Sequence, residues 1–154
     1  MIAGSFEIVV SDYTSSVEEY RRAQQAPRSD LPPLSDDQRA AARGFKISEE
    51  EYARGALAGI YGRKRQQARG RRLGEEVQKI LSDLGSDDRV VRVAYEMDRL
   101  RWVVSIEASG RILDVAVPRE LADDVLDRAL REQTEELRAR VARGLGRTVA
   151  VAKP

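Results

Sequence analysis

The chain has 154 residues, enough to bury a sizeable core, and its 27 basic and 26 acidic residues leave a net charge of only +1. So small a net charge excludes a global attraction to nucleic acid or membranes, and such a partner must therefore recognise a local patch. The chain has neither cysteine nor histidine. This excludes disulfides, thiolate metal sites, cysteine nucleophiles and every catalytic triad that uses histidine.

The same composition argues against catalysis. Without histidine, acid–base chemistry would depend on Asp, Glu, Lys or Tyr side chains, and the adjacent carboxylates at 87–88 and 123–124 are more typical of turns than of metal sites. We therefore expect a protein that is not an enzyme and that binds no cofactor and no metal.

The hydropathy pattern predicts no membrane association. No apolar run approaches the length of about 18 residues that a membrane span needs. The first residues also lack the basic start and the apolar run of a signal peptide. We expect a cytoplasmic protein, and the Arg- and Ala-rich composition favours a prokaryotic or viral origin.

Residues 1–34 are predicted to form an N-terminal arm and linker. Residues 6–10 have the β-branched composition of a short strand, residues 16–25 are compatible with a short helix, and residues 27–33 are rich in proline. Two possibilities remain open for this arm. Either it docks on its own domain, or it reaches a neighbouring subunit or another partner.

Two capping boxes mark the next helix starts, Ser35 with Gln38 and Ser48 with Glu51. The first predicts a helix from residue 36 to about residue 43. The spacing around the following turn loosely resembles a helix-turn-helix motif. However, the glutamates at 49–51 would stand where phosphates lie against a recognition helix, so we do not expect this helix to read DNA.

The stretch 48–84 organises the chain. Apolar residues recur at helical spacing over residues 52–61 and again over residues 73–84. Between these parts lies a basic segment, residues 62–72, in which six of eleven residues are Lys or Arg. Because it offers almost no apolar side chain, this segment cannot contribute to a core.

The pattern leaves open whether the stretch is one continuous helix or two. Glycine inside a helix costs about 1 kcal/mol relative to alanine, and Gly70 lies within the basic segment while Gly74 lies just after it. These glycines favour two helices hinged near them over a single long helix.

Three strand-like runs follow, at residues 90–95, 100–106 and 112–117. Each has apolar residues at alternate positions, and the connections are short, so the runs predict a three-stranded antiparallel meander. The charges on the opposite face of the meander are typical of a solvated surface.

The remaining residues predict one long C-terminal helix. Apolar residues recur at helical spacing over residues 119–143, after a proline that suits a helix start. The apolar run at 148–152 is either a strand that pairs with residues 6–10 or a flexible end. The whole predicts an α+β fold, with one domain at residues 35–147 and a tail at residues 148–154.

The order helix, three strands, helix resembles the topology of the double-stranded-RNA-binding domain. That family reads RNA with a Gly-Pro-x-His loop between its first two strands and with a Lys-rich start to its last helix. Here acidic residues stand in both places, in the loop 96–99 and in the helix start 119–124. The resemblance therefore implies a topology and does not imply this mode of RNA recognition.

Two groups of residues are candidates for binding. The basic segment offers contacts to the phosphates of RNA or DNA, or to an acidic protein surface, and the alternative is a merely solvated helix. Its candidate residues are Arg63, Lys64, Arg65, Arg69, Arg71 and Arg72. The candidates for a protein interface are Trp102, Tyr20, Gly55 and Gly59, which combine large aromatic area with small helix positions.

These observations predict a non-enzymatic interaction module, an assembly or adaptor protein that acts as an oligomer with itself or another protein as partner. The alternative is a protein that binds RNA or DNA through the basic segment.

Overall fold

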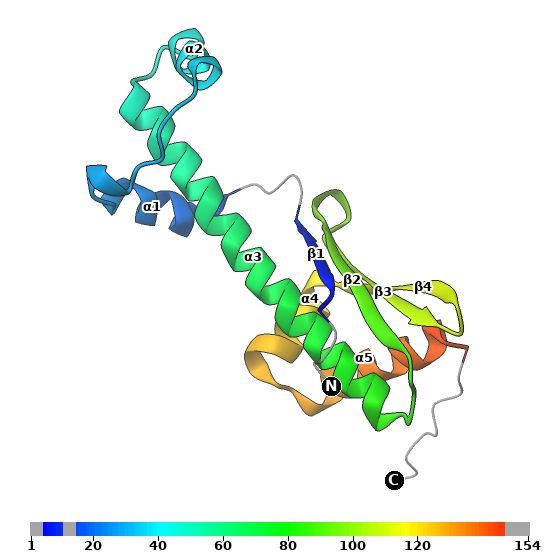
Figure 1. Ribbon diagram of the computed structural model, residues 1–154. Helices are drawn as coiled ribbons and strands as arrows, with labels where there is room; N and C mark the ends of the chain where they lie inside the picture. Colours follow the sequence, from blue (N-terminus) through cyan, green and yellow to red (C-terminus); the bar gives the residue numbers. More distant parts are fainter. Residues whose placement is uncertain (1–4, 11–14, 147–154) are drawn as a thin grey trace. The chain divides into compact units, whose positions relative to one another are not determined.

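A computed structural model describes residues 5–10 and 15–146 (Figure 1). The fold is α+β and consists of a helical unit, residues 12–65, and a sheet unit, residues 1–11 with residues 66–154. Each unit has its own buried cluster of apolar side chains. The predicted division into arm, domain and tail stays a prediction.

Within the part of the helical unit that the structure describes, there are three α-helices. These are α1 (Val17–Gln25), α2 (Asp36–Gly44) and the first part of α3 (Glu49–Asp83), which continues into the sheet unit. One turn of 3₁₀-helix, Arg28–Asp30, lies between α1 and α2.

Local hydrogen bonds explain where these helices start. Ser16 and Ser35 each complete a capping box with the residue three positions later, and the hydroxyl of Ser48 accepts a hydrogen bond from the amide of Glu51 at 3.0 Å. The predicted helix starts at Ser35 and Ser48 are therefore confirmed.

Among its described residues, the sheet unit contains four strands in the order β1-β2-β3-β4. They are β1 (Glu7–Val10), β2 (Arg89–Glu96), β3 (Arg101–Ala108) and β4 (Arg111–Pro118). The last three form the antiparallel meander, as predicted, but β1 pairs with β2 in parallel. The prediction of a three-stranded sheet is therefore wrong in this detail, since the sheet is mixed and has four strands.

β1 joins the sheet because its alternate residues extend the face that β2 turns toward the core. In the parallel register Ile8 lies opposite Val93 and Val10 opposite Tyr95, and both partners on β2 are buried. A parallel pair requires a long crossover. Here the crossover contains the whole helical unit, so local sequence spacing could not indicate the pairing.

The helix α3 is continuous through Gly70 and Gly74, so the predicted hinge is wrong. These glycines serve close packing instead. A Cβ atom at Gly70 would lie 2.9 Å from Ile8 Cγ2 and from Trp102 Cζ3, and a Cβ atom at Gly74 would overlap the ring of Phe6. The missing side chains therefore let α3 approach the sheet closely.

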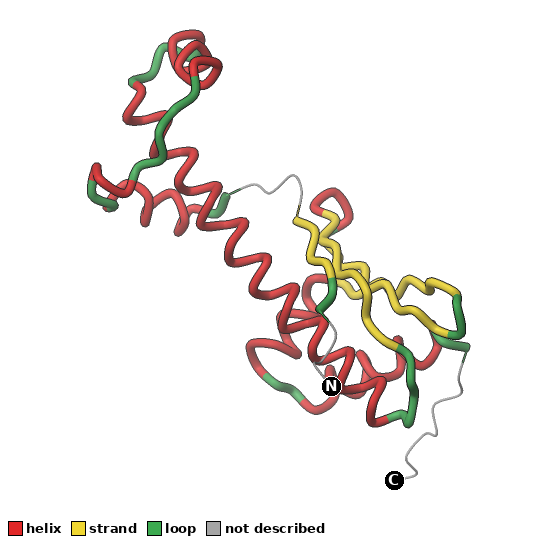
Figure 2. Tube along the Cα trace, viewed as in Figure 1, coloured by secondary structure: helices red, strands yellow, loops and turns green. Residues whose placement is uncertain are grey.

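The predicted long C-terminal helix is interrupted, which corrects the prediction for residues 119–143. The structure has α4 (Arg119–Asp123), then a π-helical turn (Asp124–Arg128), then α5 (Arg131–Gly144). Ala129 has φ 49° and ψ 38°, in the left-handed region, and Leu130 is extended. Figure 2 shows this break as a short loop between the two helical stretches. Helical apolar spacing alone did not reveal it.

The helices of the sheet unit pack on the face of the sheet that carries its buried apolar residues. Gly70 of α3 contacts Trp102 there, and Gly144 of α5 lies so close to Val115 that a Cβ atom would be 2.7 Å from its Cγ2. The opposite face carries ion pairs between strands, such as Arg101 with Glu96 at 3.0 Å. The predicted apolar run at residues 148–152 lies outside the described residues.

Candidate nucleic-acid interface

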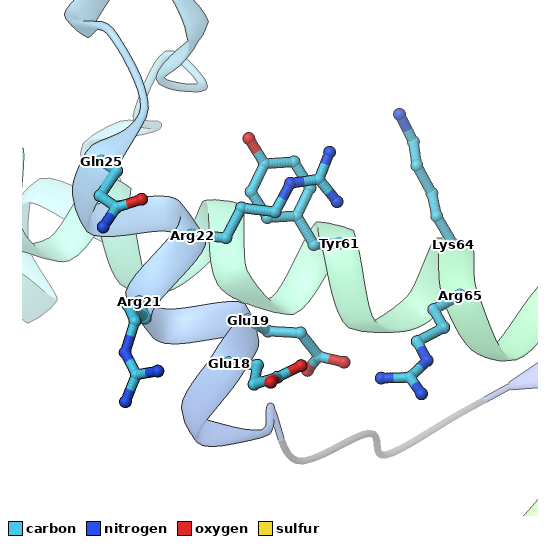
Figure 3. Close-up of a pocket in the computed structure, with 8 residues that line it drawn as sticks. All are labelled: Glu18, Glu19, Arg21, Arg22, Gln25, Tyr61, Lys64 and Arg65. Atoms are coloured by element: carbon cyan, nitrogen blue, oxygen red, sulfur yellow. The ribbon is translucent and has the colours of Figure 1, made fainter.

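An open groove of about 610 Å³ lies between α1 and α3 within the helical unit (Figure 3). Its walls combine four cationic side chains, two carboxylates, one amide and one aromatic ring. The lining residues are Glu18, Glu19, Arg21, Arg22 and Gln25 of α1 with Tyr61, Lys64 and Arg65 of α3.

Small apolar residues hold α1 against α3 and so form the groove. Ala23 of α1 and Ala58 of α3 are both fully buried, and Leu57 is 6% exposed. Ala26, Leu31 and Tyr61 pack around this cluster. Because alanine side chains are short, the two helix backbones approach closely and their longer neighbours form the walls of the groove.

Arg54 ties the C-terminal end of α1 to α3. Its Nη1 atom donates to the carbonyl oxygens of Ala23 at 2.8 Å, Gln24 at 3.2 Å and Ala26 at 2.9 Å. The last carbonyls of a helix have no partner within the helix, and a cation also suits this negative end of the helix dipole. Arg54 therefore fixes one wall of the groove.

Glu50 connects this contact to the residues that follow α1. Its carboxylate accepts from Arg54 Nη2 at 3.0 Å and pairs with Arg28 Nη2 at 3.2 Å. The hydrogen bond from Arg54 has the largest effect and lowers the pKa of Glu50, burial opposes it, and the charge and hydrogen bond of Arg28 lower the pKa further, so that it lies below its usual value.

The groove also contains a stacked cation and ring. The guanidinium carbon of Arg22 lies over the ring of Tyr61, 4.2 Å from its centroid, and Figure 3 shows the two side chains together above α3. Tyr61 is held from below by the small apolar cluster, whereas Arg22 is exposed. A planar charged group is thus kept in a fixed place at the surface.

The four cations of the groove, Arg21, Arg22, Lys64 and Arg65, make no ion pair with any residue that the structure describes. Of the carboxylates, Glu19 is 6% exposed, and its Oε2 atom accepts from the amide of Ser16 at 2.7 Å. Glu19 therefore serves the start of α1, and the groove presents more positive than negative charge.

The basic segment separates into two parts with different surroundings. Arg63, Lys64 and Arg65 are exposed in the helical unit, and Arg71 is exposed in the sheet unit. The other two candidates have partners in the sheet unit, and they are Arg69 and Arg72.

Arg69 bonds to Asp127 at 2.9 Å and also pairs with Asp123, and its side chain is only 13% exposed. Arg72 donates from Nη2 to the carbonyl oxygen of Leu126 at 2.6 Å. Burial alone lowers the pKa of Arg69, but the hydrogen bond and charge of Asp127 and the charge of Asp123 together raise it. Both arginines thus hold the π-helical turn against α3.

The four interface candidates lie in different surroundings. Trp102 is 1% exposed and packs 4.8 Å from Tyr95 between ring centroids, so it belongs to the core of the sheet unit. Tyr20 is 47% exposed on α1. A Cβ atom at Gly55 would meet nothing within 4 Å, and one at Gly59 would reach only ordinary contact distance.

Sequence patterns did not identify the contribution of α1 to the groove. Arg21, Arg22 and the carboxylates lie in the stretch predicted to be an arm, and the spacing of residues 52–61 predicts only that Tyr61 lies on the apolar face of a helix. A signal was present, since Arg21 and Arg22 are adjacent cations in a short helix. Nothing in the spacing, however, indicates that α1 packs beside residues 61–65.

Within residues 5–10 and 15–146, no group of three or more His, Cys, Asp or Glu side chains is arranged to hold a metal ion. Among the helices of the same residues, none has both the length and the apolar character needed to cross a membrane.

Comparison of the chain with protein-family models, with curated proteins and with solved structures finds no significant match.

Proposed function

We propose that this protein is a non-enzymatic binding module and that its helical unit binds nucleic acid through the groove between α1 and α3. The observation that carries the proposal is that four cations from two helices line one open groove and make no ion pair with any described residue. Unpaired cations gathered in one place attract a polyanion, and counterion release adds to its affinity. The lack of histidine and cysteine supports the non-enzymatic character.

A phosphate backbone suits this groove better than an isolated carboxylate does. Three of the four cations are arginines, whose planar guanidinium presents several donors in the geometry that phosphate oxygens accept. The groove is open, so a polymer can pass along it. Arg63, two residues after Tyr61 on α3, is also exposed but does not line the groove.

The test compares two triple variants that lower the net charge by the same amount. The groove variant replaces Arg21, Lys64 and Arg65 by Gln. The control variant replaces three exposed cations of the sheet unit that have no ion pair to a described residue, namely Arg111, Arg119 and Arg138.

Binding is measured by fluorescence anisotropy with labelled RNA and DNA of about 20 nucleotides, over a range of salt concentrations. We expect the groove variant to lose most of its affinity and to reduce the slope of log affinity against log salt by about 2. The control variant should bind like the wild type. Equal losses in the two variants would show that only net charge matters, which would refute a site in the groove.

A second candidate function is self-assembly, because the helical unit exposes large apolar side chains. Val17 and Phe45 are each 72% exposed and Tyr20 is 47% exposed. Such side chains mark protein interfaces when they form a patch. If they mediate assembly, replacing Val17 and Phe45 by Ser should lower the native mass measured by light scattering. Ile112, which is 58% exposed in the sheet unit, gives the matched control Ile112→Ser.

A further inference from the structure

We infer that the groove recognises single-stranded nucleic acid, with one unpaired base stacked on the exposed face of the Arg22 guanidinium above Tyr61. This inference rests on the proposed function and makes it more specific. A groove lined by cations alone would bind any phosphate backbone, double or single stranded. The stacked pair of Arg22 and Tyr61 is the feature that distinguishes these ligands.

Arg22 is held in place before a ligand binds. Its guanidinium carbon lies 4.2 Å from the centroid of the Tyr61 ring, and that ring packs on the buried cluster of Ala23, Leu57 and Ala58. A long side chain fixed in this way loses little conformational entropy on binding. Planar guanidinium groups and aromatic rings are the usual stacking partners of unpaired bases.

Two further cations of α3, Lys64 and Arg65, line the same groove as this stacked pair. Lys64 and Arg65 follow Tyr61 by three and four residues, so both lie one turn further along α3. Figure 3 shows Lys64 projecting on the same side of α3 as the Arg22 and Tyr61 pair, whereas Arg65 projects on the other side, toward Glu18 and Glu19. A nucleotide with its base on Arg22 can therefore place an adjoining phosphate against Lys64.

A duplex can use the cations of the groove but not the stacked pair, so it should bind more weakly than a single strand. In a double helix the base faces are covered by their neighbours, so a base reaches Arg22 only when it is unpaired. The exposed carboxylate of Glu18 on the wall of the groove repels a second phosphate backbone.

The experiment uses the full chain and measures affinity for a single strand and for the matching duplex. Arg22→Lys keeps the charge but removes the planar group, and Arg138→Lys makes the same exchange at an exposed position of the sheet unit as the control. Tyr61→Leu removes the ring, and Tyr61→Phe keeps it. We expect Arg22→Lys and Tyr61→Leu to weaken single-strand binding by about tenfold and to leave duplex binding unchanged.

A fluorescent purine analogue in the single strand gives a second readout, because stacking quenches its emission. Quenching should occur with the wild type and with Tyr61→Phe, and it should be lost with Arg22→Lys. Thermal unfolding of each variant verifies that the helical unit still folds.

The outcomes separate this inference from the proposed function. Equal affinity for single strand and duplex, with no effect of Arg22→Lys, would overturn the inference and leave the proposed function intact. Failure to bind either nucleic acid would overturn both. Equal binding of polyglutamate would also overturn both, because the groove would then select acidic polymers in general.

Discussion

The two parts of the basic segment are both rich in cations but have different partners. Arg63, Lys64 and Arg65 are exposed, and no described carboxylate pairs with them. Arg69 and Arg72, a few residues later on the same helix, bond to Asp127 and to the carbonyl oxygen of Leu126. The first part can attract a ligand, whereas the second stabilises the fold.

This difference shows that a run of cations does not by itself define a binding surface. What decides the role of each arginine is the element that packs next to it. The π-helical turn, Asp124–Arg128, lies beside Arg69 and Arg72 and supplies an acid and a carbonyl group. Beside Lys64 and Arg65 lies α1, which supplies further arginines.

The largest loss of stability should come from replacing Arg69, which has partners in the sheet unit. Arg69→Met keeps the length of the side chain but takes its charge away from Asp123 and Asp127. Since Arg69 is mostly buried while the two aspartates are about half exposed, we expect a loss of about 2 kcal/mol of unfolding free energy. Urea unfolding followed by the fluorescence of Trp102, the only tryptophan of the chain, measures this loss. Trp102 reports on it because it lies in the same unit as Arg69.

Arg63→Met is the matched control in the first part of the segment. Arg63 is exposed and unpaired among the described residues, so the change should stay within about 0.5 kcal/mol. If the two variants lost equal stability, the distinction between the two parts of the segment would be wrong.

A smaller effect should distinguish glycines of α3 in the two units. Gly70→Ala adds a Cβ atom 2.9 Å from Ile8 and Trp102, and overpacking should outweigh the gain in helix propensity and cost about 1 kcal/mol. Gly55→Ala meets nothing within 4 Å, so the same exchange should stabilise the protein by up to about 1 kcal/mol. Urea unfolding compares them, and a stabilising Gly70→Ala would contradict the close packing of α3 on the sheet.

Much of the fold could be predicted because it depends on local patterns. The helix starts at Ser35 and Ser48 depend on side chains three residues apart, and the strands of the meander depend on alternation and short turns. The addition of β1 could not be predicted in this way, because its partner β2 is about eighty residues away in sequence. The role of Gly70 likewise depends on what packs against it, which propensity does not describe.

The candidate site could be predicted only in part. The sequence indicates where cations are dense, and this includes Lys64 and Arg65. It does not indicate that Arg22 covers Tyr61, since that contact joins residues thirty-nine positions apart. It also does not distinguish Arg69, which has acidic partners, from Arg65, because the partners come from another element of the fold.

The smallest change in stability should come from the ion pairs that Glu50 makes with arginines of the helical unit. Arg54 and Arg28 bind Glu50, whereas Arg22 and Arg65 do not pair with a described carboxylate. The pKa of Glu50 is lower in the folded state than its usual value of 4.5, so its ionised form stabilises the fold above that pH. This contribution is lost as the pH falls through the lowered pKa.

Thermal unfolding of the wild type and of Glu50→Gln should therefore differ at neutral pH and converge in acid. The difference should be small and should shrink at high salt, because the carboxylate is partly exposed and screened. Glu51→Gln, one residue further along the same helix turn, is the control and should show no such convergence, since Glu51 has no ion pair to a described residue. A difference for Glu50→Gln that persisted unchanged in acid would mean that Arg54 holds α1 through its three carbonyl bonds alone. The charge of Glu50 would then contribute nothing to the wall of the groove.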